Sequence, residues 1–161
     1  MKRIAGSKQG AAFLVAAAAL AVAALDASAN DSVPLRGKDT FSSSIVGGTG
    51  SAVETADAGS GTLAHLGRFT MVASETVDFA TSSVTDGVFT LTAANGDTVR
   101  GTYSGTILPG LVGYHVTGPI TGGTGRFAGA TGSIVFDGTF DPLTFTGSDV
   151  ISGSISTVGS L

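Results

Sequence analysis

Apolar and polar residues alternate one by one along most of this chain, and Val, Ile, Leu and Phe recur at the apolar positions. Side chains of a β-strand point alternately to opposite faces, so this pattern is typical of strands with one buried face. Residues with a high helix propensity are scarce after the first 29. The pattern predicts strands near Leu35–Val46, Thr62–Glu75, Val88–Ala93, Asp97–Ile107, Tyr114–Thr121, Ser133–Phe140 and Leu143–Ser156.

Seven or eight short strands in one domain predict an all-β sandwich or a closed barrel. The last predicted strand carries Asp149 and two glycines, Gly147 and Gly153, on its otherwise apolar face. Glycines on an inward face indicate tight curvature or a close approach of two backbones, which a small barrel needs more than a flat sandwich does. We therefore expect a single antiparallel barrel of about eight strands.

One hairpin can be predicted in detail. Phe89, Leu91 and Ala93 share one face of a strand, and the apolar face of the next strand includes Val99 and Tyr103. Residues directly opposite each other must share a face. A three-residue loop over 94–96 pairs Leu91 with Val99, whereas a two-residue turn would pair Leu91 with a charged residue. We expect the longer loop, with a left-handed glycine at position 96.

The first 29 residues have the features of a cleavable signal peptide. Basic residues at the start are followed by an apolar run from Ala11 to Leu25 and by small residues at 27–29. The run is shorter than the roughly 20 residues of a membrane-spanning helix. We expect residues 1–29 to be removed and residues 30–161 to form a secreted or periplasmic barrel domain with no integral membrane span.

Composition narrows the possible functions of the mature domain. Without the leader the net charge is about −6, which disfavours binding to nucleic acid. The chain has no cysteine, and its two histidines, His65 and His115, lack acidic neighbours at metal-ligand spacing. We expect no bound metal and no cofactor.

A glycine-rich segment covers residues 121–132. Its Gly123-x-Gly125-x-x-Ala128 spacing formally matches a dinucleotide-binding fingerprint, but that fingerprint requires a helix to begin at the glycines. The following segment, Ser133–Phe140, has the pattern of a strand. We interpret the glycines as a hinged connection between two neighbouring strands.

This segment also carries a resemblance to a known family. Gly122-Gly-Thr-Gly-Arg-Phe127, followed by Gly129-Ala-Thr-Gly132 and a returning strand, resembles the late glycine-rich segment of dirigent proteins and allene oxide cyclases. Thr62-Leu-Ala-His-Leu-Gly-Arg-Phe69 is similar to a segment of bacterial exported relatives of that barrel. The resemblance implies an eight-stranded antiparallel barrel. It carries no catalytic residue over to this chain, which lacks the cysteine of the cyclase pocket.

Five residues are candidates for a site inside the barrel. His65 alternates with Leu63, Phe69 and Met71, so it is a candidate inward acid or base or, alternatively, a hydrogen-bonded core residue. Asp149 is a second candidate catalytic residue; it could instead turn outward or pair with Arg68 or Arg100. The candidate ligand-binding residues on apolar faces are Tyr103, Phe89 and Phe145. Glu75 closes a predicted strand, so we expect it on a solvated face.

The leading functional expectation is binding of a small apolar ligand, such as a lipid or a phenolic, inside the barrel. The alternatives are a cyclase or isomerase acting on an apolar substrate there, and a structural protein of the cell envelope or matrix. An apolar cavity without convergent titratable groups would favour binding, His65 and Asp149 facing each other would favour catalysis, and a solid core would favour the structural role. A homo-oligomer is possible if the sheet leaves an open edge.

Overall fold

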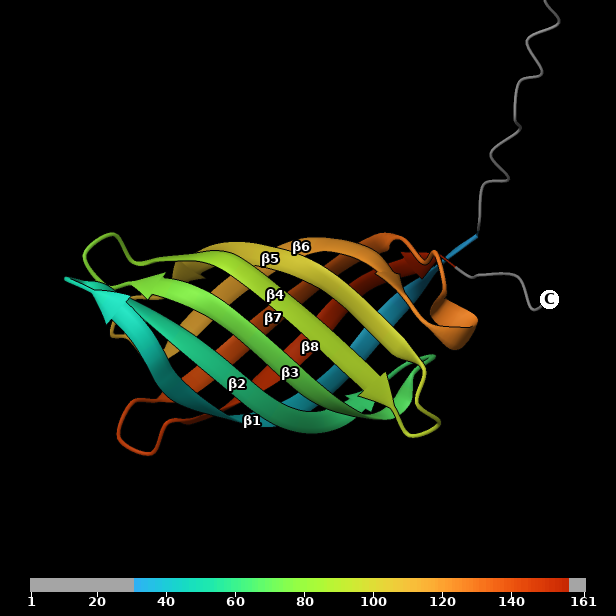
Figure 1. Ribbon diagram of the computed structural model, residues 1–161, viewed down its shortest axis with the longest axis horizontal. Coiled ribbons are helices and arrows are strands. Elements are labelled where there is room, and N and C mark those ends of the chain that lie inside the picture. Colours follow the sequence, from blue (N-terminus) through green and yellow to red (C-terminus); the bar gives the residue numbers. More distant parts are fainter. Residues whose placement is uncertain (1–30, 157–161) are drawn as a thin grey trace, which may run out of the picture.

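The computed structural model describes residues 31–156, so the expected signal peptide at 1–29 lies outside the described residues. The described chain forms eight strands and one short 3₁₀ helix (Figure 1). The elements are β1 (Ser32–Thr49), β2 (Ala52–Leu63), β3 (Gly67–Asp78), β4 (Ser83–Ala93), β5 (Thr98–Ile107), β6 (Gly113–Gly123), η1 (Gly125–Phe127), β7 (Gly132–Asp141) and β8 (Thr146–Ser156). Among residues 31–156, no helix has the length and apolar character needed to cross a membrane.

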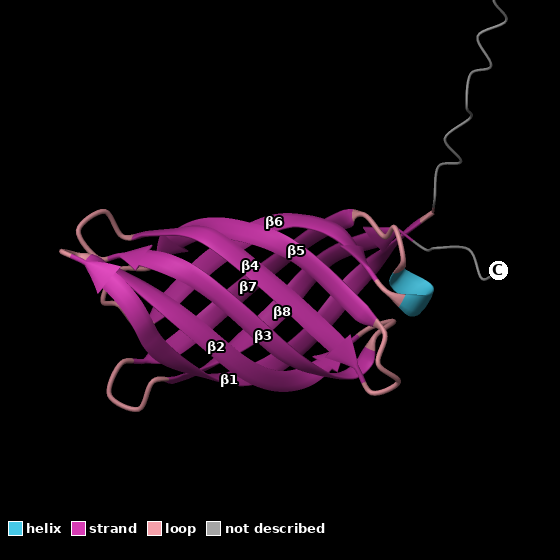
Figure 2. Cartoon of the chain, viewed as in Figure 1, coloured by secondary structure: helices cyan, strands magenta, loops and turns pink. Residues whose placement is uncertain are grey.

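Each strand pairs antiparallel with the next, and β8 returns to pair with β1, so the sheet closes into a barrel (Figure 2). The closing ladder runs from Ser32 opposite Ser156 to Ser42 opposite Thr146, and it places Asp39 opposite Asp149. The expected closed antiparallel barrel is confirmed. Closure leaves no strand edge in the described sheet on which a second chain could pair. The open edge on which a homo-oligomer was expected to depend is therefore not present in this sheet.

The prediction of one continuous strand over Thr62–Glu75 is wrong. The chain turns at residues 64–66, which separate β2 from β3, and most of β2 had not been predicted. Its residues between Ala52 and Gly61 are mainly Ala, Gly, Ser and acids, which have little strand propensity. The last strand begins at Thr146 rather than at Leu143, because a turn over 142–145 precedes it.

The predicted β4–β5 hairpin is confirmed in detail. Leu91 lies opposite Val99, and the Ala93 N–H donates to the carbonyl of Asp97 at 2.8 Å, which leaves a loop over 94–96. Gly96 has a φ of +88°, the left-handed conformation that glycine adopts without steric cost. The side-chain alternation of two strands was therefore sufficient to fix their register.

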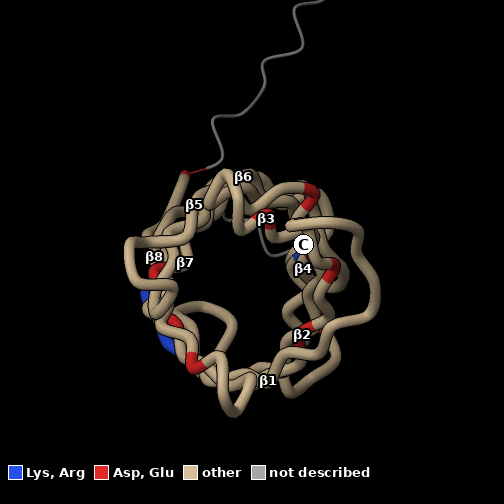
Figure 3. The backbone as a smooth tube through the Cα atoms, turned by 90° about the vertical axis from the view of Figure 1, so that its left-hand side faces the viewer, with Lys and Arg blue, Asp and Glu red and all other residues tan. Residues whose placement is uncertain are grey.

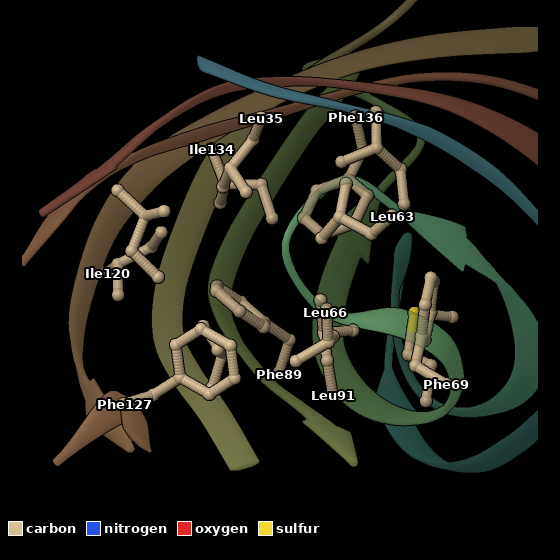
Figure 4. Close-up of a cluster of buried hydrophobic side chains, with 14 of the residues drawn as sticks. Leu35, Leu63, Leu66, Phe69, Phe89, Leu91, Ile120, Phe127, Ile134 and Phe136 are labelled. Carbon is tan, nitrogen blue, oxygen red and sulfur yellow. The ribbon is translucent and has the colours of Figure 1, made fainter. Parts of the chain in front are cut away.

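One half of the barrel interior is filled by apolar side chains. These come from most strands of the barrel, as Figure 4 shows for Leu35, Leu63, Phe69, Leu91, Ile120 and Ile134. The turns that connect β2 to β3 and β6 to β7 close this end with Leu66, Phe127 and Ala130, all of which are buried. We call these nine residues the apolar plug.

The glycine-rich segment builds part of this closed end. Its glycines lead through η1 into β7, and they turn the Phe127 side chain into the plug. Arg126 fastens the segment, because its side chain contacts the Asp97 carboxylate at 3.2 Å and donates to the Leu66 carbonyl at 3.4 Å. The expected strand connection is confirmed, and no long helix follows the glycines.

Truncating the plug tests whether it is the main source of stability. Leu91 is 0% exposed, so we expect Leu91→Ala to lower the free energy of unfolding by about 2–5 kcal/mol through lost burial and a cavity. Val88, on the outward face of the same strand, is the control, and Val88→Ala should change stability by about 0.5 kcal/mol or less. Urea denaturation of both variants measures the difference. Equal effects of the two substitutions would contradict this description of the core.

Candidate functional site

The other half of the barrel holds a cavity of about 210 Å³. It is bordered by the turns that connect β3 to β4, β5 to β6 and β7 to β8, which lie at the end facing the viewer in Figure 3. Its walls are mainly apolar and aromatic: Phe41, Ile45, Val53, Met71, Ala73, Val77, Val84, Phe89, Ile107, Val116, Phe136 and Phe140. A cavity of this kind is the usual form of a small-molecule site in a closed barrel.

Four carboxyl groups meet in this otherwise apolar interior. Asp57, Glu75 and Asp149 line the cavity, and Asp39 is buried next to Asp149, its cross-strand partner. The four come from β2, β3, β8 and β1, which are consecutive around the closed barrel. We call Asp39, Asp57, Glu75 and Asp149 the acidic cluster.

Two tyrosines connect the acidic cluster to the opposite wall. The Tyr103 hydroxyl donates to Glu75 Oε2 at 2.6 Å, and the Tyr114 hydroxyl donates to Asp149 Oδ1 at 2.5 Å. Burial, and then the negative charge of the carboxylate partner, raises the pKa of both hydroxyls far above the usual range. Both tyrosines therefore keep their protons and act as donors.

Glycines on neighbouring strands make room for these tyrosines. A Cβ at Gly87 would collide with the Tyr103 ring, and a Cβ at Gly138 would collide with both the Tyr114 ring and the Asp149 carboxyl. These are the close approaches that inward glycines were expected to permit. They allow each aromatic ring to lie flat against the next strand with its hydroxyl directed at a carboxyl group.

Asp39 and Asp149 form a carboxyl pair with very little access to water. Each is 4% exposed, and both carboxyl oxygens of Asp39 are buried. Burial, and then the charge of Asp149, raises the pKa of Asp39 to about 8. Burial also raises the pKa of Asp149, although the hydrogen bond from Tyr114 opposes that shift. Two adjacent buried carboxyls avoid a double charge by sharing a proton, so the pair retains one proton at neutral pH.

The pKa of Asp57 lies close to neutrality. Burial, and then the negative charge of Glu75, raises the pKa of Asp57 to about 7. One of its oxygens, Oδ1, is buried without a hydrogen-bond partner. The hydroxyl of Thr55 on the same strand, whose residue is 8% exposed and lines the cavity, is also without a partner. The cavity thus contains polar atoms whose hydrogen bonds the folded chain leaves unmade.

No cation offsets the acidic cluster within the described residues. All five Lys and Arg side chains there are exposed, and so are both histidines. His115 is occupied with Asp137 on the outer surface, where Nδ1 and Oδ1 lie 2.6 Å apart. Within residues 31–156, no group of three or more His, Cys, Asp or Glu side chains has an arrangement that could hold a metal ion.

Four of the five candidate site residues lie around the cavity: Asp149, Tyr103, Phe89 and Phe145. Asp149 points inward and pairs with neither Arg68 nor Arg100, which are both exposed. His65 does not join them. It is an exposed residue of the β2–β3 turn, at the plugged end, with a φ of +66°. The expectation that His65 points into the barrel is wrong because the strand pattern that suggested it is interrupted by this turn.

Four important residues were not among the candidates: Asp39, Asp57, Glu75 and Tyr114. The expectation of a solvated Glu75 is wrong, since Glu75 lines the cavity. A signal for it was present, because Glu75 continues the alternation of Phe69 and Met71. Asp39 likewise lies on the strand face that carries Leu35 and Phe41. No such alternation identified Asp57, because most of β2, the strand that carries it, had not been predicted.

The raised carboxyl pKa values make stability depend on pH in a defined direction. Between about pH 4 and pH 8 the folded chain keeps protons on Asp39 and Asp57 that the unfolded chain releases. Stability is therefore greatest near the lower limit and decreases as pH rises, by at most ~1.4 kcal/mol per pH unit for each linked proton. We expect the melting temperature to fall between pH 5 and pH 8.

Asp39→Asn should flatten this dependence and raise the melting temperature at pH 8, because the amide carries no charge and can donate to Asp149. Glu54→Gln, on the outer face of β2, should keep the slope of the unmodified protein. Thermal denaturation at several pH values measures all three proteins. A melting temperature that is constant or rises over this interval would contradict the assignment of protonated carboxyls.

Comparison of the chain with protein families, with curated proteins and with solved structures found no match.

Proposed function

We propose that this protein binds a small, largely apolar ligand in the cavity of its barrel. The observation that carries the proposal is the apolar cavity of about 210 Å³, whose lining also includes carboxyl groups and two tyrosines. A compact ligand with one aromatic ring or a short aliphatic chain, related to a phenolic or to a lipid fragment, fits this space.

The surroundings of the cavity support the entry of such a ligand. Large apolar side chains are exposed on the turns at this end: Phe79, Leu108, Leu111, Val112, Leu143 and Phe145. Exposed apolar side chains beside a cavity are typical of a binding surface. Phe79, Leu111 and Phe145 also line the cavity, so the apolar surface continues from the exterior into the interior.

The proposal includes the place of action and the relationship of the chain. The leader pattern at 1–29 supports export to the periplasm or the exterior. The glycine-rich segment and the eight closed strands support a relationship with the barrel of dirigent proteins and allene oxide cyclases.

Filling the cavity tests the binding function. Ala73 lines the cavity from β3, and Ala58 is exposed on the outer face of β2. We expect Ala73→Phe to weaken binding of apolar fluorescent dyes by about ten-fold or more, since the new ring occupies the ligand volume. Ala58→Phe should bind as the unmodified protein does. Fluorescence titration gives the affinities, and native mass spectrometry detects a ligand retained by the protein from its secreting host.

The proposal is overturned if the protein retains no ligand and binds no dye, or if Ala73→Phe binds as tightly as Ala58→Phe. The first of these outcomes would support the structural role in the envelope or matrix.

A second candidate function is a cyclase or isomerase acting on an apolar substrate inside the barrel. Asp57 favours it, because a carboxyl with a pKa of about 7 can donate or accept a proton at neutral pH. Asp57 lines the cavity next to the hydroxyl of Tyr103, which is held by Glu75. A ligand eluted after incubation of the complex in D₂O should then carry deuterium on carbon. Asp57→Asn should abolish this exchange, and an unlabelled ligand from the unmodified protein would exclude the activity.

A further inference from the structure

We propose that the ligand is an amine that carries a positive charge, with its ammonium group at the acidic cluster and its apolar body among the aromatic rings. This inference rests on the proposed binding function and specifies the class of ligand. It follows from three properties of the cavity: the hydrogen bonds it leaves unmade, its charge and its aromatic walls.

The unused polar atoms of the cavity are acceptors. The hydroxyl donors of Tyr103 and Tyr114 are already engaged by Glu75 and Asp149. What remains is Asp57 Oδ1 and the Thr55 hydroxyl, neither of which has a partner. Asp57 Oδ1 accepts a hydrogen bond when the carboxyl is charged, the Thr55 hydroxyl can accept one as well as donate one, and an ammonium group supplies up to three donors from one atom.

The charge of the site favours a cation over a neutral donor. Four carboxyl groups lie in an apolar interior, and no Lys, Arg or His among the described residues faces them. A carboxylate without an opposite charge is costly in such surroundings. An ammonium group would offset that cost through charge-assisted hydrogen bonds, which are roughly twice as strong as neutral ones. An anionic ligand, such as a fatty acid, would be repelled by the same groups.

The aromatic walls complete a site for an organic cation. Phe89, Tyr103 and Phe136 form one group of rings, with centroids 5.7–6.3 Å apart. Phe41 contacts Tyr114 and Phe140 in a second group, with centroids 6.3 and 6.4 Å apart. Ring faces attract cations within ~6 Å, and rings also pack against an apolar ligand body. Rings and carboxyls together match an amine that carries an aromatic or short aliphatic group.

The test compares three probes of similar shape and different charge: phenethylamine, phenethyl alcohol and hydrocinnamate. Isothermal titration calorimetry at pH 7 should give an affinity for phenethylamine about ten-fold or more above that for phenethyl alcohol. Hydrocinnamate should bind more weakly than the alcohol. Binding of phenethylamine should also release protons, because the ammonium group favours the charged form of the carboxyls, whereas the alcohol should release none. Titrations in two buffers with different ionisation enthalpies measure this release.

A matched pair of substitutions locates the effect. Glu75→Gln keeps the size of the side chain and an acceptor for Tyr103, and it should lower the affinity for phenethylamine about ten-fold while leaving that for phenethyl alcohol nearly unchanged. Glu54→Gln makes the same chemical change on the outer face of β2 and should alter neither affinity. Retained binding of the alcohol shows that the Glu75→Gln cavity is intact. Thr55→Val, which keeps the shape of the residue, should weaken amine binding by a few-fold.

The outcomes separate this inference from the function on which it rests. Equal affinities for the amine and the alcohol, tighter binding of hydrocinnamate, or an amine affinity that Glu75→Gln leaves unchanged would overturn the amine assignment. The alcohol would still demonstrate an apolar site. Failure of the amine, the alcohol and the dyes to bind would overturn both proposals.

Discussion

The pairing of β8 with β1 is the constraint on which the rest of the structure depends. This ladder closes the sheet, so every second residue of eight strands must point into one narrow interior. The same ladder places Asp39 opposite Asp149 and therefore creates the carboxyl pair. Without closure these side chains would lie on a sheet face open to water. Because the sheet is closed, the protonation and the hydrogen bonds of these side chains depend on the whole barrel.

The two halves of the interior differ in role: the apolar plug stabilises the fold, and the other half holds the cavity. Apolar residues fill the plugged end, and some of them, such as Leu91 and Ile134, are 0% exposed. The other end accepts buried carboxyls and unpaired polar atoms, which lower the stability of the folded chain. The burial of the plug, which packs in one core cluster with cavity-lining residues such as Phe89 and Phe136, offsets this loss of stability. Conformational strain is not needed to explain the arrangement, because glycines such as Gly138 give the large rings their space.

The parts of the fold that could be predicted were those in which local pattern and tertiary packing agree. The β4–β5 register followed from the faces of Leu91 and Val99 alone, and the inward position of Asp149 followed from the alternation of β8. β2 escaped prediction because its inward residues include Asp57, Gly59 and Gly61, which have no strand signal of their own. This strand is held by its neighbours' ladders, β1 on one side and β3 on the other. His65 was misplaced for the related reason that the turn before β3 interrupts an otherwise continuous alternation.

The sequence by itself determined the all-β class and the apolar character of one face of its strands, because alternation along each strand is a local property. Alternation left a sandwich or a barrel open, and only the glycines on inward faces favoured the barrel. It also identified Tyr103, Phe89 and Asp149 as residues of an inner face. Only the tertiary structure decided that Asp39, Asp57 and Glu75 join Asp149 and that two tyrosines bind to them. These groups lie far apart in the chain, and their meeting depends on the register of four strands around the closed barrel. Their raised pKa values arise from that shared burial, which no single strand can produce.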